Sequence, residues 1–316
     1  MEWSKMGKIF DPTQYKLIND CSEFAQSPQA LVFEDYVRIY FSSRKKSDNG
    51  KFISYIHFID MDKEFKEVIN ISKETVIELG ELGCFDEHGI FPMNVLRFDN
   101  KIYAYTSGWT RRVSVPADSG IGLAISYDEG ASFEKIGNGP VMTSSLYEPF
   151  LVADPFVLVI GDIFHMWYIY GTEWSAPVNE MSVERTYKIG HATSLDGVNW
   201  KKEGKQIITD KYSDECQALP TIIHFKEQYH MFFCYRQSFD FRNNKDRGYR
   251  IGYAYSDDLS NWIRDDSKVG IDVTEGSWDS DMMCYPNVFN CDGKIYMLYN
   301  GNQFGRYGFG LAQLVE

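Results

Sequence analysis

The sequence predicts an all-β fold, a five-bladed β-propeller whose ring is closed when the N-terminal strand pairs with the C-terminal blade. Three observations predict it. A unit of similar length recurs five times, each unit reads as strand, hairpin, strand, loop and strand, and aromatic residues make up 16% of the chain. Repeats of this kind are typical of propellers, and aromatic side chains favour strands. Alternating βαβ units are absent, which excludes an α/β fold.

Five prolines mark the repeat, at intervals of 64, 63, 65 and 66 residues. They are Pro28, Pro92, Pro155, Pro220 and Pro286. Each precedes an apolar strand, a polar turn and a second, aromatic strand. Turn pairs such as Asp99-Asn100 and Asp292-Gly293 adopt the positive φ that tight hairpins need. We expect one propeller domain over residues 1–316, with blades near 22–75, 86–143, 148–209, 214–272 and 278–316.

The last unit lacks a fourth strand, because the chain ends at Glu316, directly after its third strand. Residues 2–10 have the same phase as the stretches that begin at Phe133 and Trp200, each of which starts a fourth strand. We therefore expect residues 2–10 to join the C-terminal blade and close the ring, since closure removes exposed sheet edges.

The charge and composition disfavour several kinds of partner. Asp and Glu number 45 against 32 Lys and Arg, a net charge of −13, whereas nucleic acids and anionic membranes are bound by basic faces. No apolar run approaches the ~18 residues of a membrane-spanning helix, and no secretion signal is visible. The 6 cysteines show no metal-binding or redox spacing. We expect a cytoplasmic protein with reduced thiols; its oligomeric state is not indicated.

No cofactor is expected. The chain contains neither HxH nor HExxH, which disfavours a catalytic metal. Glycine-rich phosphate loops and GxSxG elbows are also absent, so nucleotide hydrolysis and serine-esterase chemistry are disfavoured.

The repeat and its motifs resemble the five-bladed propeller glycosidases of glycoside hydrolase families 43, 32, 68 and 130. These motifs are DP before an inner strand, SxDGxxW at a third strand and WDSxMxxYP near the end, and the likeness covers essentially the whole chain. The stretches that begin at Phe233 and Trp278 resemble a subgroup that accompanies bacterial surface-polysaccharide biosynthesis. The resemblance implies a carbohydrate ligand and an enzyme of glycosidase type, which cleaves or transfers a glycosyl group in a central funnel.

The resemblance also implies catalytic residues. Ala153-Asp154-Pro155 is similar to the RDP motif of family 32, whose Asp stabilises the transition state. Asp214-Glu215-Cys216 is similar to the EC motif of that family, whose Glu is the general acid/base. Glycosidic chemistry needs one protonated and one ionised carboxyl group, so Glu215 as acid/base and Asp154 as hydroxyl anchor are chemically sensible.

A third carboxylate of the family pattern is missing. Ser27 and Phe91 stand before the prolines where an Asp would be expected. We expect Asp281, or else Glu87, to replace it as a catalytic group. For Asp279 and Asp281 the structural alternative is that their side chains accept backbone N–H bonds at the blade entry.

Further residues are expected to bind substrate: Glu87, His88, Trp109, Trp174, Arg236, Arg250, Trp278 and Asp279. Tryptophans stack on sugar faces, although packing in the core is an equal alternative. The arginines between Tyr235 and Arg250 are unusual in an acidic chain, and guanidinium groups bind phosphate or carboxylate in a bidentate way. They indicate a phosphorylated or acidic sugar, or inorganic phosphate; pairing with Asp240 and Asp246 is the structural alternative.

Two other functions stay open beside the glycosidase. One is a non-catalytic propeller that binds a glycan or sugar phosphate in polysaccharide biosynthesis, which the missing carboxylate favours. The other is a phosphate-dependent glycoside phosphorylase. The fold alone does not decide, because propellers host many functions.

Overall fold

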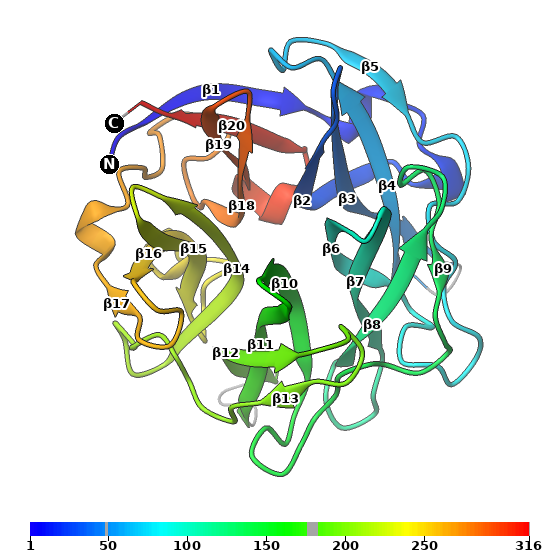
Figure 1. The fold of residues 1–316 in the computed structure, drawn as a ribbon, viewed down its shortest axis with the longest axis vertical. Coiled ribbons are helices and arrows are strands. Elements are labelled where there is room, and N and C mark those ends of the chain that lie inside the picture. The colour runs from blue at the N-terminus through cyan, green and yellow to red at the C-terminus, as the bar shows by residue number, and fades with distance from the viewer. Residues whose placement is uncertain (48–49, 176–182, 316) are drawn as a thin grey trace.

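The computed structural model describes residues 1–47, 50–175 and 183–315, and these form five four-stranded sheets around a central axis (Figure 1). All strand pairs are antiparallel. The predicted five-bladed β-propeller is therefore confirmed. Within the described ranges, no helix is long and apolar enough to cross a membrane.

The blades follow one another along the chain, and in each the first strand lies innermost. The first has β2 (Glu23–Val32), β3 (Val37–Lys46), β4 (Phe52–Met61) and β5 (Val68–Ile71). The second has β6 (Ile90–Phe98), β7 (Lys101–Thr110), β8 (Asp118–Ser126) and β9 (Glu134–Lys135). The third has β10 (Val152–Ile160), β11 (Ile163–Ser175), β12 (Glu184–Ser194) and β13 (Lys201–Lys202).

The last two blades have the same plan. The fourth has β14 (Glu215–Phe225), β15 (Gln228–Gln237), β16 (Arg250–Ser256) and β17 (Ile263–Arg264). The fifth has β18 (Cys284–Cys291), β19 (Lys294–Asn300), β20 (Phe309–Leu314) and the N-terminal β1 (Trp3–Phe10). The described helices are all short: η1 (Pro12–Gln14), η2 (Ile18–Asp20), η3 (Lys245–Arg247), η4 (Asp266–Lys268) and α1 (Asn302–Gly305).

The expected ring closure is confirmed. Strand β1 pairs with β20 from Trp3 opposite Leu314 to Phe10 opposite Phe309, which brings the two ends of the chain together (Figure 1). An ion pair strengthens this join, because Lys5 Nζ lies 2.5 Å from Oδ2 of the buried Asp279.

The prolines of the repeat mark a bulge in each innermost strand. Ser27, Asp154, Leu219 and Tyr285, each directly before its proline, have φ between 47° and 57°. A register shift interrupts the strand pairing at the same place in all five blades. Bulges re-aim side chains and are frequent next to functional sites. The residues around these prolines therefore face the centre of the ring.

An aromatic residue of the repeat lies inside the second strand of each blade. These residues are Tyr40, Tyr105, Tyr168, Phe233 and Tyr299, all fully buried. The Tyr40 hydroxyl donates to Gly130 O in the second blade, and the Tyr105 hydroxyl donates to Gly197 O in the third. In these two blades the aromatic residue therefore binds the next blade. All six cysteines are free thiols, and only Cys84 is not fully buried.

Candidate active site

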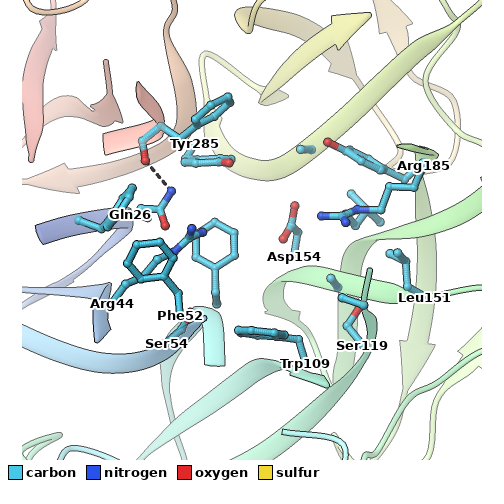
Figure 2. A pocket seen from close by; sticks show the side chains of 18 of the residues that line it. Gln26, Arg44, Phe52, Ser54, Trp109, Ser119, Leu151, Asp154, Arg185 and Tyr285 are labelled. Atoms are coloured by element: carbon cyan, nitrogen blue, oxygen red, sulfur yellow. Dashed lines mark hydrogen bonds between the residues drawn. The ribbon is translucent and has the colours of Figure 1, made fainter. Parts of the chain in front are cut away.

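A cavity of about 490 Å³ lies at the end of the ring where the innermost strands begin (Figure 2). Every blade contributes to its lining through its innermost strand, with Gln26, Phe91, Asp154, Ala218 and Tyr285. The size is within the ~300–1,000 Å³ typical of small-molecule sites. Much of the wall is aromatic: Phe24, Phe52, Phe91, Trp109, Tyr187, Phe241, Tyr249, Tyr285 and Phe304.

Asp154 holds the most chemically unusual position in the cavity. The bulge before Pro155 gives it a φ of 53°, and its backbone N–H donates to Ser107 Oγ at 2.7 Å. One carboxylate oxygen, Oδ2, accepts the Leu219 N–H at 3.2 Å. Burial raises the pKa of Asp154 to about 7, against the opposing effects of the Leu219 hydrogen bond and the charge of Arg185. Near neutral pH this carboxyl group is therefore able both to hold and to release a proton.

The cavity is strongly cationic, although the chain as a whole is acidic. Its basic lining residues are Arg44, Lys51, Arg111, Arg185, Arg236 and Arg242. Among the described residues, Asp118 and Asp154 are the only acidic ones in the lining. Asp118 is ion-paired with Arg112 on the exposed side of the cavity, which leaves Asp154 as the buried carboxyl group.

Trp109 and Arg236 lie in the cavity wall, as expected of them. Trp109 packs against Gly89, where an added Cβ would approach the indole Nε1 to 2.6 Å, so the ring needs a glycine at this position. Arg236 stacks on Phe241, with 3.6 Å between the guanidinium carbon and the ring centroid.

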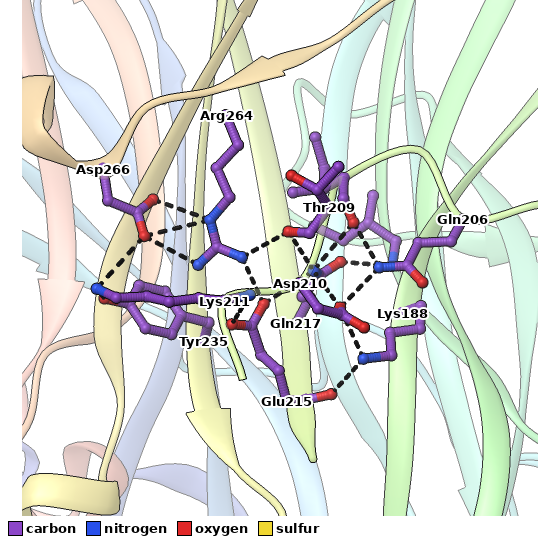
Figure 3. A network of polar contacts seen from close by, with 12 residues as sticks. Lys188, Gln206, Thr209, Asp210, Lys211, Glu215, Gln217, Tyr235, Arg264 and Asp266 are labelled. Atoms are coloured by element: carbon purple, nitrogen blue, oxygen red, sulfur yellow. Dashed lines mark hydrogen bonds and ion pairs between the residues drawn. The ribbon is translucent and has the colours of Figure 1, made fainter. Parts of the chain in front are cut away.

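Glu215 is not part of the cavity lining, which corrects the position expected from the EC motif (Figure 3). Its side chain is fully buried in a polar network, and Oε1 accepts from Arg264 Nη1 at 2.6 Å and from Gln217 Nε2 at 2.9 Å. The other oxygen, Oε2, accepts the Lys211 N–H at 3.0 Å. Both oxygens are therefore bound by protein donors outside the cavity.

The carboxylates expected to complete the catalytic set also lie outside the cavity. Asp281 is exposed, and its side chain accepts a hydrogen bond from Ser280 Oγ. Asp279 is buried and binds the Lys5 ammonium group, a structural role different from the backbone hydrogen bonds expected as the alternative. Glu87 accepts from the Gly83 N–H and from Thr110 Oγ1, and these bonds lower its pKa.

Four other expected binding residues lie outside the lining as well. His88 is stacked behind Trp109 with 5.8 Å between the ring centroids. Trp278 stacks on Tyr299, and Trp174 packs against the apolar core shared by the third, fourth and fifth blades. Arg250 donates to the carbonyl oxygens of Tyr249, Asp281 and Lys245, so it fixes a loop.

The sequence reasoning missed Arg44, Arg185, Tyr187, Tyr249 and Tyr285, all of which line the cavity. Tyr285 had a visible signal, because it precedes Pro286 as Asp154 precedes Pro155. Arg44 and Arg185 lie near the ends of β3 and β12, where arginines in a sequence are usually interpreted as solvent-exposed.

No metal site accompanies the cavity in the part of the chain that the structure describes: no three side chains of His, Cys, Asp or Glu come together in a way that could hold an ion. The polar groups that line the cavity include the guanidinium groups, the tyrosine hydroxyls and Asp154.

Two proteins of similar sequence are known from Mycobacterium tuberculosis. The uncharacterized proteins Rv1502 (strain H37Rv) and MT1551 (strain CDC 1551) are each 34% identical to this chain over 315 residues, which is 99% of both chains. No protein-family model matches the sequence.

Solved structures share the fold at low sequence identity. A glycoside hydrolase has a TM-score of 0.74 at 16% identity and covers 98% of this chain and 91% of its own. The β-1,2-mannobiose phosphorylase from Listeria innocua has a TM-score of 0.68 at 12% identity and covers 99% and 96%. A thermostable family-43 glycoside hydrolase has a TM-score of 0.63 at 16% identity and covers 92% and 88%. The expected likeness to five-bladed propeller glycoside hydrolases is therefore confirmed at the level of the fold.

Proposed function

We propose that this chain, which belongs to the same family as the two Mycobacterium tuberculosis proteins, is a carbohydrate-active enzyme that cleaves or transfers a glycosyl group in the central cavity. The observation that carries the proposal is Asp154, a buried carboxyl group with a pKa of about 7 in an aromatic cavity on a glycosidase-type fold. Titratable groups with strongly shifted pKa values in a cleft are candidates for catalysis.

Asp154 acts as the general acid in this proposal. A glycosidic bond breaks when the departing oxygen receives a proton, and an acid whose pKa lies near the working pH donates it most effectively. The Leu219 N–H fixes one carboxylate oxygen, which orients the group. Trp109 and the other aromatic rings supply flat apolar faces for the sugar, while Gln26 and Ser119 offer polar groups at the wall.

A hydrolase needs a second group to attack the anomeric carbon or to activate water. Of the described lining residues, only Asp118 is a further carboxylate, and Arg112 pairs with it. This shortage favours a second candidate, phosphorolysis. There, an oxygen of inorganic phosphate bonds to the anomeric carbon, the glycosidic C–O bond breaks, and the Asp154 proton goes to the departing oxygen. The basic lining would hold the phosphate.

A cytoplasmic location and a part in polysaccharide biosynthesis belong to the same proposal. Six free cysteines suit a reducing compartment, and the biosynthetic setting is supported by the sequence resemblance alone.

The test is a screen of aryl glycosides and oligosaccharides with and without inorganic phosphate, using wild-type protein and Asp154→Asn. We expect turnover of at least one substrate and a loss of about 10²-fold or more in the variant, the usual contribution of a general acid. Dependence on phosphate identifies phosphorolysis. Sugar binding without turnover under either condition contradicts the catalytic proposal and supports the binding-only alternative.

A further inference from the structure

We propose that the cavity contains an oxyanion subsite, formed by Arg44, Arg185 and Arg236, which binds a carboxylate or phosphate group. The proposal deepens the proposed function and rests on it in one respect: the anion is taken to belong to an acidic carbohydrate or to a small co-substrate of the glycosyl reaction.

Two other arginines of this fold with little exposed side chain, Arg38 and Arg264, have acidic partners. The buried Arg38 binds Asp60 through two bonds, of 2.7 Å from Nε and 2.9 Å from Nη2. Arg264 binds both Glu215 and Asp266. Such pairing offsets the cost of removing a guanidinium from water. An arginine that is buried without an acid therefore indicates a missing partner.

Arg236 is such a residue. It is 4% exposed, and no carboxylate pairs with it in the described ranges. Its Nη1 donates to the carbonyl oxygens of Gln237 and Ser238, while its Nε has no acceptor. Phe241, Tyr187 and Tyr249 surround the guanidinium. Aromatic faces, carbonyls and a hydrogen bond with Tyr249 hold the group in place, and none of these partners is a carboxylate.

Arg44, in the lining of the same cavity, is likewise held by aromatic rings. Its guanidinium carbon lies 4.7 Å from the ring centroid of Phe24 and 5.9 Å from those of Phe52 and Phe91. The structure gives this side chain no hydrogen bond or ion pair with any described residue, and its buried Nε lacks an acceptor. Burial and the charge of Arg185 lower the pKa of Arg44, a cost that a bound anion would relieve.

Arg185 completes the subsite and connects it with Asp154. In Figure 2 the Arg44 and Arg185 side chains extend from different walls of the cavity, with Asp154 between them. Arg185 lies over Trp174 and Tyr187, at 5.8 and 6.0 Å from the ring centroids, and has no ion pair within the described part of the chain. Its charge acts on Asp154, so an anion bound here lies close to the proposed proton donor.

The shared chemistry of the three arginines identifies the ligand as an oxyanion. Planar guanidinium groups bind carboxylate and phosphate in a bidentate way, and none of the three is neutralised by the protein. A neutral sugar would leave three like charges facing one cavity. A carboxylate or phosphate, whether carried by the sugar or free in solution, supplies the counter-charge.

The test is calorimetric titration with four probes: inorganic phosphate, glucuronate, glucose 6-phosphate and uncharged glucose. We expect at least one anionic probe to bind more tightly than glucose. The affinity for that probe should fall at least tenfold in each of three variants, Arg44→Gln, Arg185→Gln and Arg236→Gln. Arg97→Gln is the matched control, since Arg97 is exposed and outside the cavity; it should bind as wild type. Binding of phosphate alone identifies a free co-substrate, and binding only of the charged sugars identifies an acidic carbohydrate.

The proposal is overturned if wild-type protein binds no anionic probe with a Kd near or below about 1 mM, or if folded arginine variants bind anions as well as wild type does. Melting curves show which variants are folded. Because three arginines are substituted separately, the test still works if one variant does not fold. Asp154→Asn separates the two proposals: anion binding should survive in it. If anions bind in an arginine-dependent way but no glycoside is turned over, only the proposed function is ruled out. If neutral glycosides are turned over but no anion binds, only the oxyanion subsite is ruled out.

Discussion

The Nη1 atom of Arg264 lies 2.6 Å from the Oε1 atom of Glu215, in a buried pair that joins the outermost and innermost strands of the fourth blade. The pair makes Glu215 a structural residue. We expect Glu215→Gln to lower the free energy of unfolding by about 1–3 kcal/mol, because Arg264 then keeps only Asp266 as an acidic partner. Chemical denaturation measures this. Asp281→Asn is the control, since Asp281 is exposed and makes no ion pair with a described residue; equal stability of the two variants would contradict the structural role.

Two buried arginines should differ in how much the same substitution changes the stability of the fold. Arg38→Gln leaves the buried Asp60 carboxylate without its cation and should lower the free energy of unfolding by about 3–5 kcal/mol. Arg236→Gln removes a charge that has no acidic partner, so its cost should be much smaller, or the variant should be more stable than wild type. Melting temperatures compare them directly. If Arg236→Gln is as damaging as Arg38→Gln, Arg236 serves the fold and not a ligand.

Asp154 should make stability depend on pH in a predictable direction. Its folded-state pKa of about 7 lies above the ordinary value of 3.8, because burial favours the protonated form. The stabilisation is fully present below the unfolded pKa and is lost as pH rises through about 7. Asp154→Asn cannot ionise, so its stability relative to wild type should rise between pH 5 and pH 8, by about 3 kcal/mol. A difference that does not change with pH would show that Asp154 is not buried as described.

Closure of the ring should depend on Lys5 far more than on the nearby Lys8. Lys5→Ala leaves the Asp279 carboxylate buried without its cation and should cost about 3 kcal/mol. Lys8 pairs with Asp11 at the surface, so Lys8→Ala should change stability by less than about 1 kcal/mol. Thermal unfolding of the two variants provides the comparison, and a similar loss in both would contradict an anchoring role for Lys5.

The fold could be predicted because each blade repeats the same chemistry, a proline at the inner bulge and an aromatic residue inside the second strand. Asp154 could be predicted from its place directly before Pro155. Glu215 misled the prediction because it lies five residues before Pro220, upstream of the bulge, where the strand directs its side chain into the outer network (Figure 3). Arg44 and Arg185 could not be found, because they come from blades other than that of Arg236, which was expected, and meet it only in the folded ring.

The central claim is that Asp154, and not Glu215, donates the proton at the glycosidic bond. The most direct measurement is turnover of one glycoside by wild type, Asp154→Asn and Glu215→Gln, each folded and assayed at the same pH. The account predicts a loss of about 10²-fold or more for Asp154→Asn and turnover within about threefold of wild type for Glu215→Gln. Near-normal turnover by Asp154→Asn, with activity abolished in folded Glu215→Gln, would contradict it.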